Sequence, residues 1–146
     1  MRRTIALVAC VAKKQPTPRP AQDLYCSAWF RKASAYASRV ADGWYILSAK
    51  HGLVPPDRII APYNETLKTM PAAARRAWAE GVLDDLDAVL KPSDHLMILA
   101  GQDYRTFLVA SLQQRGFIVN VPMEGLRIGE QMSWLKRRLE RISACP

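Results

Sequence analysis

Trp44-Tyr45-Ile46-Leu47-Ser48-Ala49-Lys50-His51-Gly52-Leu53 is the stretch of sequence that decides the fold. Its first four residues form an apolar run of strand length, and a turn containing glycine follows directly. The turn carries Lys50 and His51, and His51 is one of only two histidines in the chain. The charge of imidazole changes near neutral pH, and glycine lets backbone approach a ligand closely. An ordinary surface turn explains an isolated Lys-His pair equally well, so its place in the fold decides its meaning.

Apolar runs and segments of helical spacing alternate along the whole chain. The predicted strands are residues 5–10, 44–48, 95–100 and 117–121. Apolar residues with helical spacing cover about 23–41, 74–89, 104–112 and 128–142. This alternation is typical of βαβ units around a mostly parallel sheet. The sequence therefore predicts a single α/β domain over residues 1–146, a three-layer sandwich whose sheet of about four strands is flanked by helices.

Residues 50–68 contain three prolines and no sustained period, which predicts a long loop. Long loops inside a compact domain are usually functional or disordered. After it, Pro71 suits the first turn of a helix, with Thr69 as its cap. Arg75 is expected on the solvent face of that helix.

Length and composition restrict the class of protein. The chain has 146 residues, 49% of them hydrophobic, which suits one domain with a real core. Its longest apolar runs fall far short of the roughly 20 residues of a membrane helix. The first run is followed by lysines without a small-residue cleavage site, so we expect no signal peptide. Three cysteines without paired spacing indicate neither a disulfide framework nor a metal site, and favour a reducing, cytoplasmic location.

The chain is strongly basic. It has 21 Lys and Arg residues against 13 Asp and Glu, for a net charge of +8 and a pI near 9.8. Fourteen of the cations are arginines, the residue best suited to bidentate phosphate contacts. This balance favours nucleic acid or a nucleotide as partner. It leaves the oligomeric state undetermined.

Reactive or polar side chains follow all four predicted strands. In chain order they are Cys10, Lys13, Lys14, Ser48, Lys50, His51, Asp103, Tyr104 and Glu124. Right-handed crossovers bring the carboxyl ends of parallel strands to one edge of a sheet, where ligands bind. We therefore expect Cys10, His51 and Asp103 to converge on one cleft.

Several of these residues have a simpler structural explanation. Cys10 closes an apolar strand, where cysteine is more often a small buried hydrophobe than a nucleophile. Asp103 suits a helix cap, a role worth about 1 kcal/mol without any catalysis. Lys13 and Lys14 suit a solvated loop. Lys50 and His51 are poorly explained by packing, and they favour a functional site.

Other chemistries lack their motifs. The sequence contains no GxGxxG, no GxxxxGK[ST], no HExxH and no GxSxG. Two distant histidines make a zinc site improbable. We expect no metal and no cofactor, and Ser48 as a hydrolase nucleophile has only positional support.

The central motif resembles that of a family of small uncharacterised bacterial and phage proteins. It runs from Ser48 to Leu53 and continues with Pro55, Asp57, Ile60, Pro62, Tyr63 and Leu67. The first strand with Lys13 and Lys14 also resembles that family. Over the central motif alone, the chain is similar to the YaaA peroxide-stress proteins. The resemblance implies a compact α/β domain in a superfamily associated with DNA binding and linked with base-modifying and glycosylase-like proteins.

Both lines of reasoning predict hydrolysis of an N-glycosidic bond, with release of a base. Its oxocarbenium-like transition state needs a carboxylate to stabilise positive charge or activate water, and a donor for the departing base. Asp103 is the expected carboxylate, and His51 or Lys50 the donor. Alternatively, Lys50 could form a Schiff base with an abasic sugar, which requires burial.

The remaining candidate residues are expected to bind the substrate. Phosphate is assigned to Lys13, Lys14 and Arg105. An extruded base is expected to stack on a tyrosine. The tyrosine candidates are Tyr25, Tyr63 and Tyr104, and Cys10 and Ser48 complete the predicted lining.

Two other functions stay open at this point. A non-catalytic DNA- or RNA-binding protein would use its loops and the basic face of the last predicted helix. A sensor or hydrolase of small nucleotides would differ from a polymer binder by its weak dependence on salt.

Overall fold

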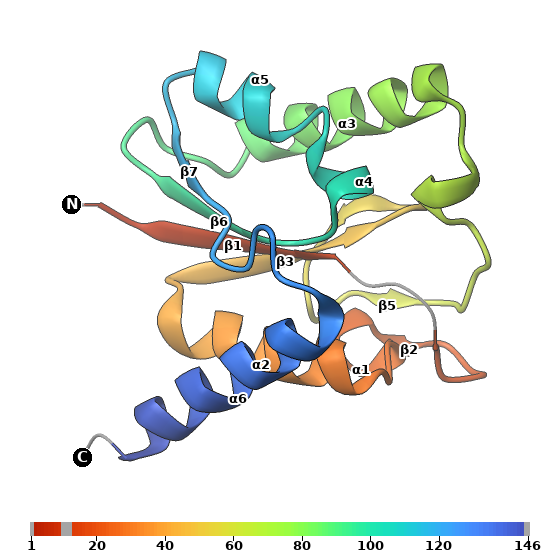
Figure 1. The fold of residues 1–146 in the computed structure, drawn as a ribbon. Helices are drawn as coiled ribbons and strands as arrows, with labels where there is room; N and C mark the ends of the chain where they lie inside the picture. The colour runs from red at the N-terminus through yellow and green to blue at the C-terminus, as the bar shows by residue number, and fades with distance from the viewer. Residues whose placement is uncertain (1, 10–12, 145–146) are drawn as a thin grey trace.

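The computed structural model describes residues 2–9 and 13–144, and its centre is a five-stranded sheet (Figure 1). The strand order is β4-β3-β1-β6-β7. Their bounds are β1 Thr4–Ala9, β3 Gly43–Ser48, β4 Gly52–Val54, β6 His95–Leu99 and β7 Ile118–Asn120. All neighbours pair in parallel except β4, which is antiparallel to β3. The four predicted strands are therefore the four parallel ones.

Strand β1 lies in the middle of the sheet, and its residues from Ile5 to Ala9 are all buried. A parallel strand covered on both faces has no need for alternating polarity, so it is a continuous apolar run. From β1 the chain passes to β3 on one side and then crosses to β6 on the other. The crevice between the carboxyl ends of β1 and β6 is where sheets of this topology bind ligands.

Helices cover both faces of the sheet (Figure 1). One layer contains α2 Ala28–Val40 and α6 Ile128–Ala144. The other contains α3 Ala72–Asp87, α4 Gln102–Arg105 and α5 Val109–Gln114. This arrangement is the predicted three-layer sandwich. No helix in the described part of the chain is both long and apolar enough to cross a membrane.

The prediction of one helix over 23–41 was wrong, because the chain forms two. Helix α1 is Ala21–Leu24, and α2 starts afresh at Ala28. Between them Tyr25 is extended and bridges to Lys14, while Ser27 Oγ accepts a hydrogen bond from Phe30 N and caps α2. Tyr25 lies in the break between the two helices and is itself buried. The spacing of apolar residues therefore continues across the break and does not reveal it.

The segment 50–68 was predicted as a loop, but it contains three short elements. Gly52, with φ +71°, turns the chain from β3 into β4, so these two strands form a hairpin. Strand β5, Ile59–Ile60, pairs with β2, Arg19–Pro20, in a separate two-stranded sheet. A 3-10 helix, η1, spans Leu67–Thr69. Elements of two or three residues are too short to produce a period.

Two predicted helix details also needed correction. Pro71 is the N-cap of α3 and has no side-chain cap hydrogen bond, while Thr69 belongs to η1. The helical segment after β6 is split into α4 and α5, although Tyr104 is buried as expected. Gly116, with φ +94°, follows α5 and ends the helical segment as predicted.

At the amino edge of the sheet, an ion pair joins the residues that precede β1 and β6. The Asp94 carboxylate is 1% exposed and accepts hydrogen bonds from Arg3 Nε at 3.0 Å and Arg3 Nη2 at 2.7 Å. Lys91 N donates to it at 2.8 Å. The Arg3 hydrogen bonds lower the pKa of the Asp94 carboxyl group below its ordinary value, despite its burial.

Candidate active site at the carboxyl edge

Three buried hydroxyl groups form a row at the carboxyl end of β3. Ser48 is wholly buried, and its Oγ accepts from His51 N at 3.0 Å and donates to Tyr63 Oη at 2.9 Å. Tyr63 Oη lies 2.6 Å from Tyr25 Oη. The row fixes the turn that carries Lys50 and His51 against two distant segments of the chain.

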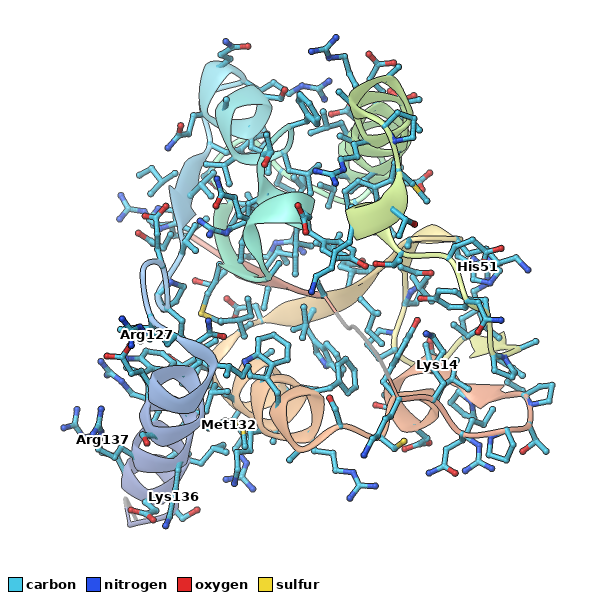
Figure 2. The ribbon with its side chains drawn as sticks, turned by 45° about the vertical axis from the view of Figure 1, so that its right-hand side comes forward. Lys14, His51, Arg127, Met132, Lys136 and Arg137 are labelled. Carbon is cyan, nitrogen blue, oxygen red and sulfur yellow. The ribbon has the colours of Figure 1, made fainter. Side chains whose placement is uncertain are left out.

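Lys14 and His51 both contact the Tyr63 ring. Lys14 Nζ lies 4.4 Å from the centroid of that ring, within cation-π range. The His51 ring meets it edge to face at 5.7 Å. Figure 2 shows Lys14 and His51 on the same side of the molecule, although they come from different segments. The basic loop after β1 and the turn after β3 therefore come together.

Burial and neighbouring charge both act on His51. Its partial burial lowers the pKa of the imidazole below its ordinary value. The positive charges of Arg58 and Lys50 lower this pKa further, and Glu65 opposes them weakly. His51 is therefore mainly neutral at pH 7, with one nitrogen that donates and one that accepts.

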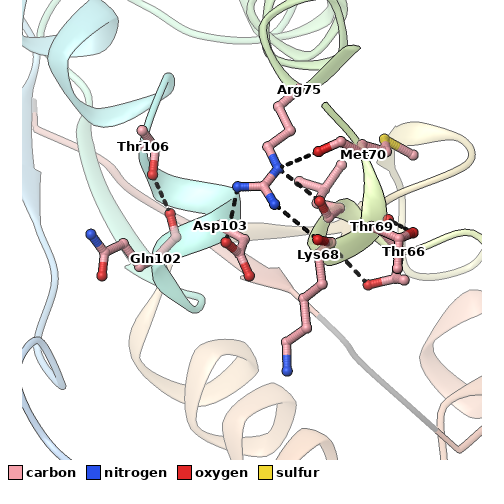
Figure 3. A network of polar contacts seen from close by, with 9 residues as sticks. Thr66, Lys68, Thr69, Met70, Arg75, Gln102, Asp103 and Thr106 are labelled. Carbon is pink, nitrogen blue, oxygen red and sulfur yellow. Dashed lines mark hydrogen bonds and ion pairs between the residues drawn. The ribbon is translucent and has the colours of Figure 1, made fainter. Parts of the chain in front are cut away.

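Asp103 lies in the first turn of α4, directly after β6, and Arg75 holds it. Arg75 Nη1 donates to Asp103 Oδ1 at 3.1 Å (Figure 3). The other guanidinium nitrogens donate to backbone: Nε to Leu67 O at 2.8 Å and Met70 O at 3.1 Å, and Nη2 to Lys68 O at 3.0 Å. The Asp103 side chain is 35% exposed. Its Oδ2 accepts no hydrogen bond from the residues that the structure describes. The result is an oriented carboxylate with one accessible oxygen.

These contacts correct two expectations. Asp103 is not a helix cap, because Gly101 occupies that position and makes no side-chain cap hydrogen bond. Arg75 does not face solvent, because its guanidinium joins η1 to α4. Lys68 was missed altogether. It is exposed, and its carbonyl oxygen accepts from the same Arg75 guanidinium that holds Asp103 (Figure 3). No motif or spacing in the sequence marks it.

A tryptophan links the ends of β3 and β6. Trp78 Nε1 donates to Ser48 O at 2.8 Å, and its ring meets the Tyr104 ring edge to face at 5.5 Å. His51 and Asp103 are therefore joined through Ser48, Trp78 and Tyr104, without a direct contact between their side chains. Cys10, the third residue of the expected convergence, lies outside the described residues.

Burial rules out several of the predicted substrate contacts. Tyr25, Tyr63 and Tyr104 are 2%, 7% and 4% exposed, so their rings have no open face on which an extruded base could stack. Ser48 uses its hydroxyl in two internal hydrogen bonds. Lys50 is exposed, so the burial that a Schiff-base lysine needs is absent.

The predicted phosphate-binding residues separate into two groups. Lys13 is exposed and precedes Lys14, whose ammonium group lies over the Tyr63 ring. Arg105 instead pairs with Glu124 at 3.0 Å and lines a cavity of about 310 Å³ at the ends of β6 and β7. In the described part of the chain, no three His, Cys, Asp or Glu residues lie close enough together to hold a metal ion.

The fold and this edge define a class: a three-layer α/β protein with a doubly wound sheet and its polar site at the carboxyl ends of the strands. The chain belongs to the family described as "Family of unknown function (DUF6884)", whose model matches residues 5–137. It is similar to the uncharacterized protein YfjM of Bacillus subtilis (strain 168), at 30% identity over 152 residues, 94% of this chain and 96% of YfjM. No solved structure matches the chain significantly.

Proposed function

We propose that the protein hydrolyses the N-glycosidic bond of a nucleotide, with nucleic acid as the preferred substrate. The observation that carries this proposal is the Asp103 carboxylate. Arg75 holds one of its oxygens, the other is accessible, and the residue follows the carboxyl end of β6, the neighbour of β1 in the sheet. A carboxylate in such a place can stabilise a developing oxocarbenium ion or accept a proton from water.

In this reaction a water oxygen bonds to the anomeric carbon while the bond from that carbon to the base nitrogen breaks. The electron pair of the broken bond leaves with the base, which takes up a proton from bulk water. Asp103 accepts the proton that the attacking water loses and afterwards returns it to bulk water. Arg75 is a positioning residue, because backbone carbonyls hold its guanidinium and thereby hold the carboxylate. Lys68 is exposed and its backbone is held by the same guanidinium, so it is the cation that we assign to a substrate phosphate.

His51 takes a different role from the one that the sequence suggested. Because its pKa is lowered, it carries little positive charge at pH 7 and is a poor proton donor to the departing base. Its neutral imidazole is better suited to orienting the base or the sugar by hydrogen bonds. The net charge of +8 and the motif's resemblance to YaaA proteins add support for a nucleic-acid substrate.

The test is incubation with a panel of modified and damaged oligonucleotides and free nucleotides, with released base measured by mass spectrometry. We expect Asp103→Asn to reduce base release by about 100-fold or more. Asp87→Asn is the matched control, because Asp87 pairs with Arg115 on an exposed surface, at the opposite end of α3 from Arg75. Undiminished release by Asp103→Asn would refute the proposed role of this carboxylate.

A non-catalytic nucleic-acid binder is the second candidate. The exposed cations of α6 favour it: Lys136, Arg137, Arg138 and Arg141. If no substrate of the panel loses its base while the protein binds these oligonucleotides, this second function replaces the first.

A further inference from the structure

The layer formed by α2 and α6 concentrates the positive charge of the chain. These helices carry seven of the 21 Lys and Arg residues, against two of the 13 Asp and Glu residues. This surplus of five positive charges is more than half of the net charge of +8. It lies on the face of the sheet opposite α3, away from Arg75 and its partners (Figure 1).

The apolar sides of both helices are occupied by packing. Trp29 Nε1 on α2 donates to Gln131 Oε1 on α6 at 2.8 Å. The Tyr36 and Trp134 rings meet edge to face at 5.2 Å, and Leu135 is wholly buried. Packing on this side leaves the cations facing outward, and Figure 2 shows Lys136 and Arg137 extending from α6 away from the sheet.

Between the two helices lies an open groove of about 540 Å³, which we call the basic groove. Its charged walls are Lys32 and Arg39 from α2, and Lys136 and Glu140 from α6. Arg39 Nη1 also donates to Ser143 Oγ at 3.4 Å, which bridges the groove. Three cations against one carboxylate make its field positive.

We propose that the basic groove binds the phosphate backbone of duplex DNA. Duplex DNA carries about one charge per 1.7 Å of its axis, and α6, at about 1.5 Å per residue, is long enough to follow several phosphates. Proteins that bind single strands stack bases on aromatic side chains, but Trp29, Tyr36 and Trp134 are used between the helices. A helix that lies on a membrane buries its apolar face in lipid, and here the apolar face of α6 packs on α2.

This inference rests on the proposed function only because that function names nucleic acid as the substrate. The experiment measures binding and needs no turnover, so the two proposals can fail separately. The experiment is fluorescence anisotropy with a labelled duplex of about 20 base pairs, roughly two helical turns, titrated over a range of salt concentrations. The test variant combines Lys32→Gln, Arg39→Gln and Lys136→Gln. The control variant removes the same charge from the opposite side of the sheet, with Arg76→Gln, Lys91→Gln and Arg115→Gln.

We expect the test variant to bind about tenfold or more weakly at low salt, with a salt slope shallower by about two to three units. The control variant should retain nearly the wild-type slope. Equal losses in the two variants, or no duplex binding by the wild type, would overturn the proposal. So would single strands or vesicles containing phosphatidylserine that compete better than the duplex does.

Two further measurements keep the result interpretable. Asp103→Asn should bind the duplex like the wild type. A loss of catalysis is then distinguished from a loss of DNA binding by the groove. If the triple variant unfolds at a lower temperature, the groove pair Lys32→Gln and Lys136→Gln, which keeps the Arg39 contact with Ser143, should still make the salt slope shallower. An unchanged slope in that folded variant would refute the basic groove as the DNA-binding surface.

Discussion

The sheet carries an aspartate-arginine pair at each end. The two pairs differ in which partner, the aspartate or the arginine, has its hydrogen-bonding groups fully used. At the amino edge, the Asp94 carboxylate is 1% exposed, and both of its oxygens accept hydrogen bonds. At the carboxyl edge, Asp103 is 35% exposed, and only one of its oxygens is held. There the arginine is the saturated partner, because Arg75 gives its other hydrogen bonds to backbone carbonyls.

This difference separates a structural pair from the pair at the candidate site. A buried carboxylate left without its partner destabilises the fold, so Asp94 contributes chiefly to stability. A carboxylate that is held at one oxygen and accessible at the other contributes little to stability and is available to a substrate. The two aspartates should therefore respond in opposite ways when the carboxylate is removed.

The largest expected effect is on turnover. Asp103→Asn should lower base release by about 100-fold or more while changing the free energy of unfolding by about 0.5 kcal/mol or less. Urea unfolding and the base-release assay on one preparation measure both quantities. If Asp103→Asn strongly lowers the free energy of unfolding, the Arg75–Asp103 pair is structural like the Arg3–Asp94 pair, and the proposed difference between them is wrong.

Asp94→Ala should show the reverse pattern. The loss of a buried acceptor for Arg3 and Lys91 N should lower the free energy of unfolding by about 2 kcal/mol. Activity at a temperature where the variant remains folded should stay near the wild-type value, because Asp94 lies at the opposite edge of the sheet. Asp87→Asn, on the exposed pair with Arg115, is the control and should be nearly neutral.

Arg75→Lys tests whether the guanidinium positions Asp103. A lysine keeps the charge but cannot reach three carbonyls and a carboxylate at once, so we expect about a tenfold loss of turnover. Arg76→Lys, its exposed neighbour on α3, is the control. If Arg75→Lys turns over at the wild-type rate, charge alone is sufficient and the orientation argument fails.

The two ends of the molecule should also differ in their dependence on pH. The Asp94 pKa is lower in the folded protein than the ordinary 3.8, so its contribution is complete above that value and is lost as pH falls through the folded pKa. The stability difference between the wild type and Asp94→Asn should therefore shrink in acid. A stability difference that does not fall as the pH is lowered below 3.8 would contradict the assigned cause.

The smallest expected effect concerns His51. Its folded pKa lies below the ordinary 6.5, so the unfolded chain binds more protons in this window and stability rises with pH through it. Urea unfolding of the wild type should therefore show a loss of stability as pH falls below 6.5. His51→Asn should flatten that slope, and an unchanged slope would assign the loss to other groups.

The sequence by itself determined the class of fold and the edge of the sheet at which the candidate site lies. Residues 5–9, 44–48 and 95–99 are apolar because parallel strands are buried on both faces, and such runs are visible without a structure. Right-handed crossovers then place their carboxyl ends together, which located His51 and Asp103 at one edge.

Only the tertiary structure decided which side chains of that edge are accessible. Tyr25 and Tyr63 are 38 residues apart, yet their hydroxyl groups meet inside the protein, and Arg75 reaches across 28 residues to Asp103. Neither contact leaves a period or a motif, because each depends on how distant loops pack rather than on local spacing. Burial and hydrogen bonding between remote segments are properties of the packed chain, and they separate a tyrosine that supports the site from a carboxylate that can act in it.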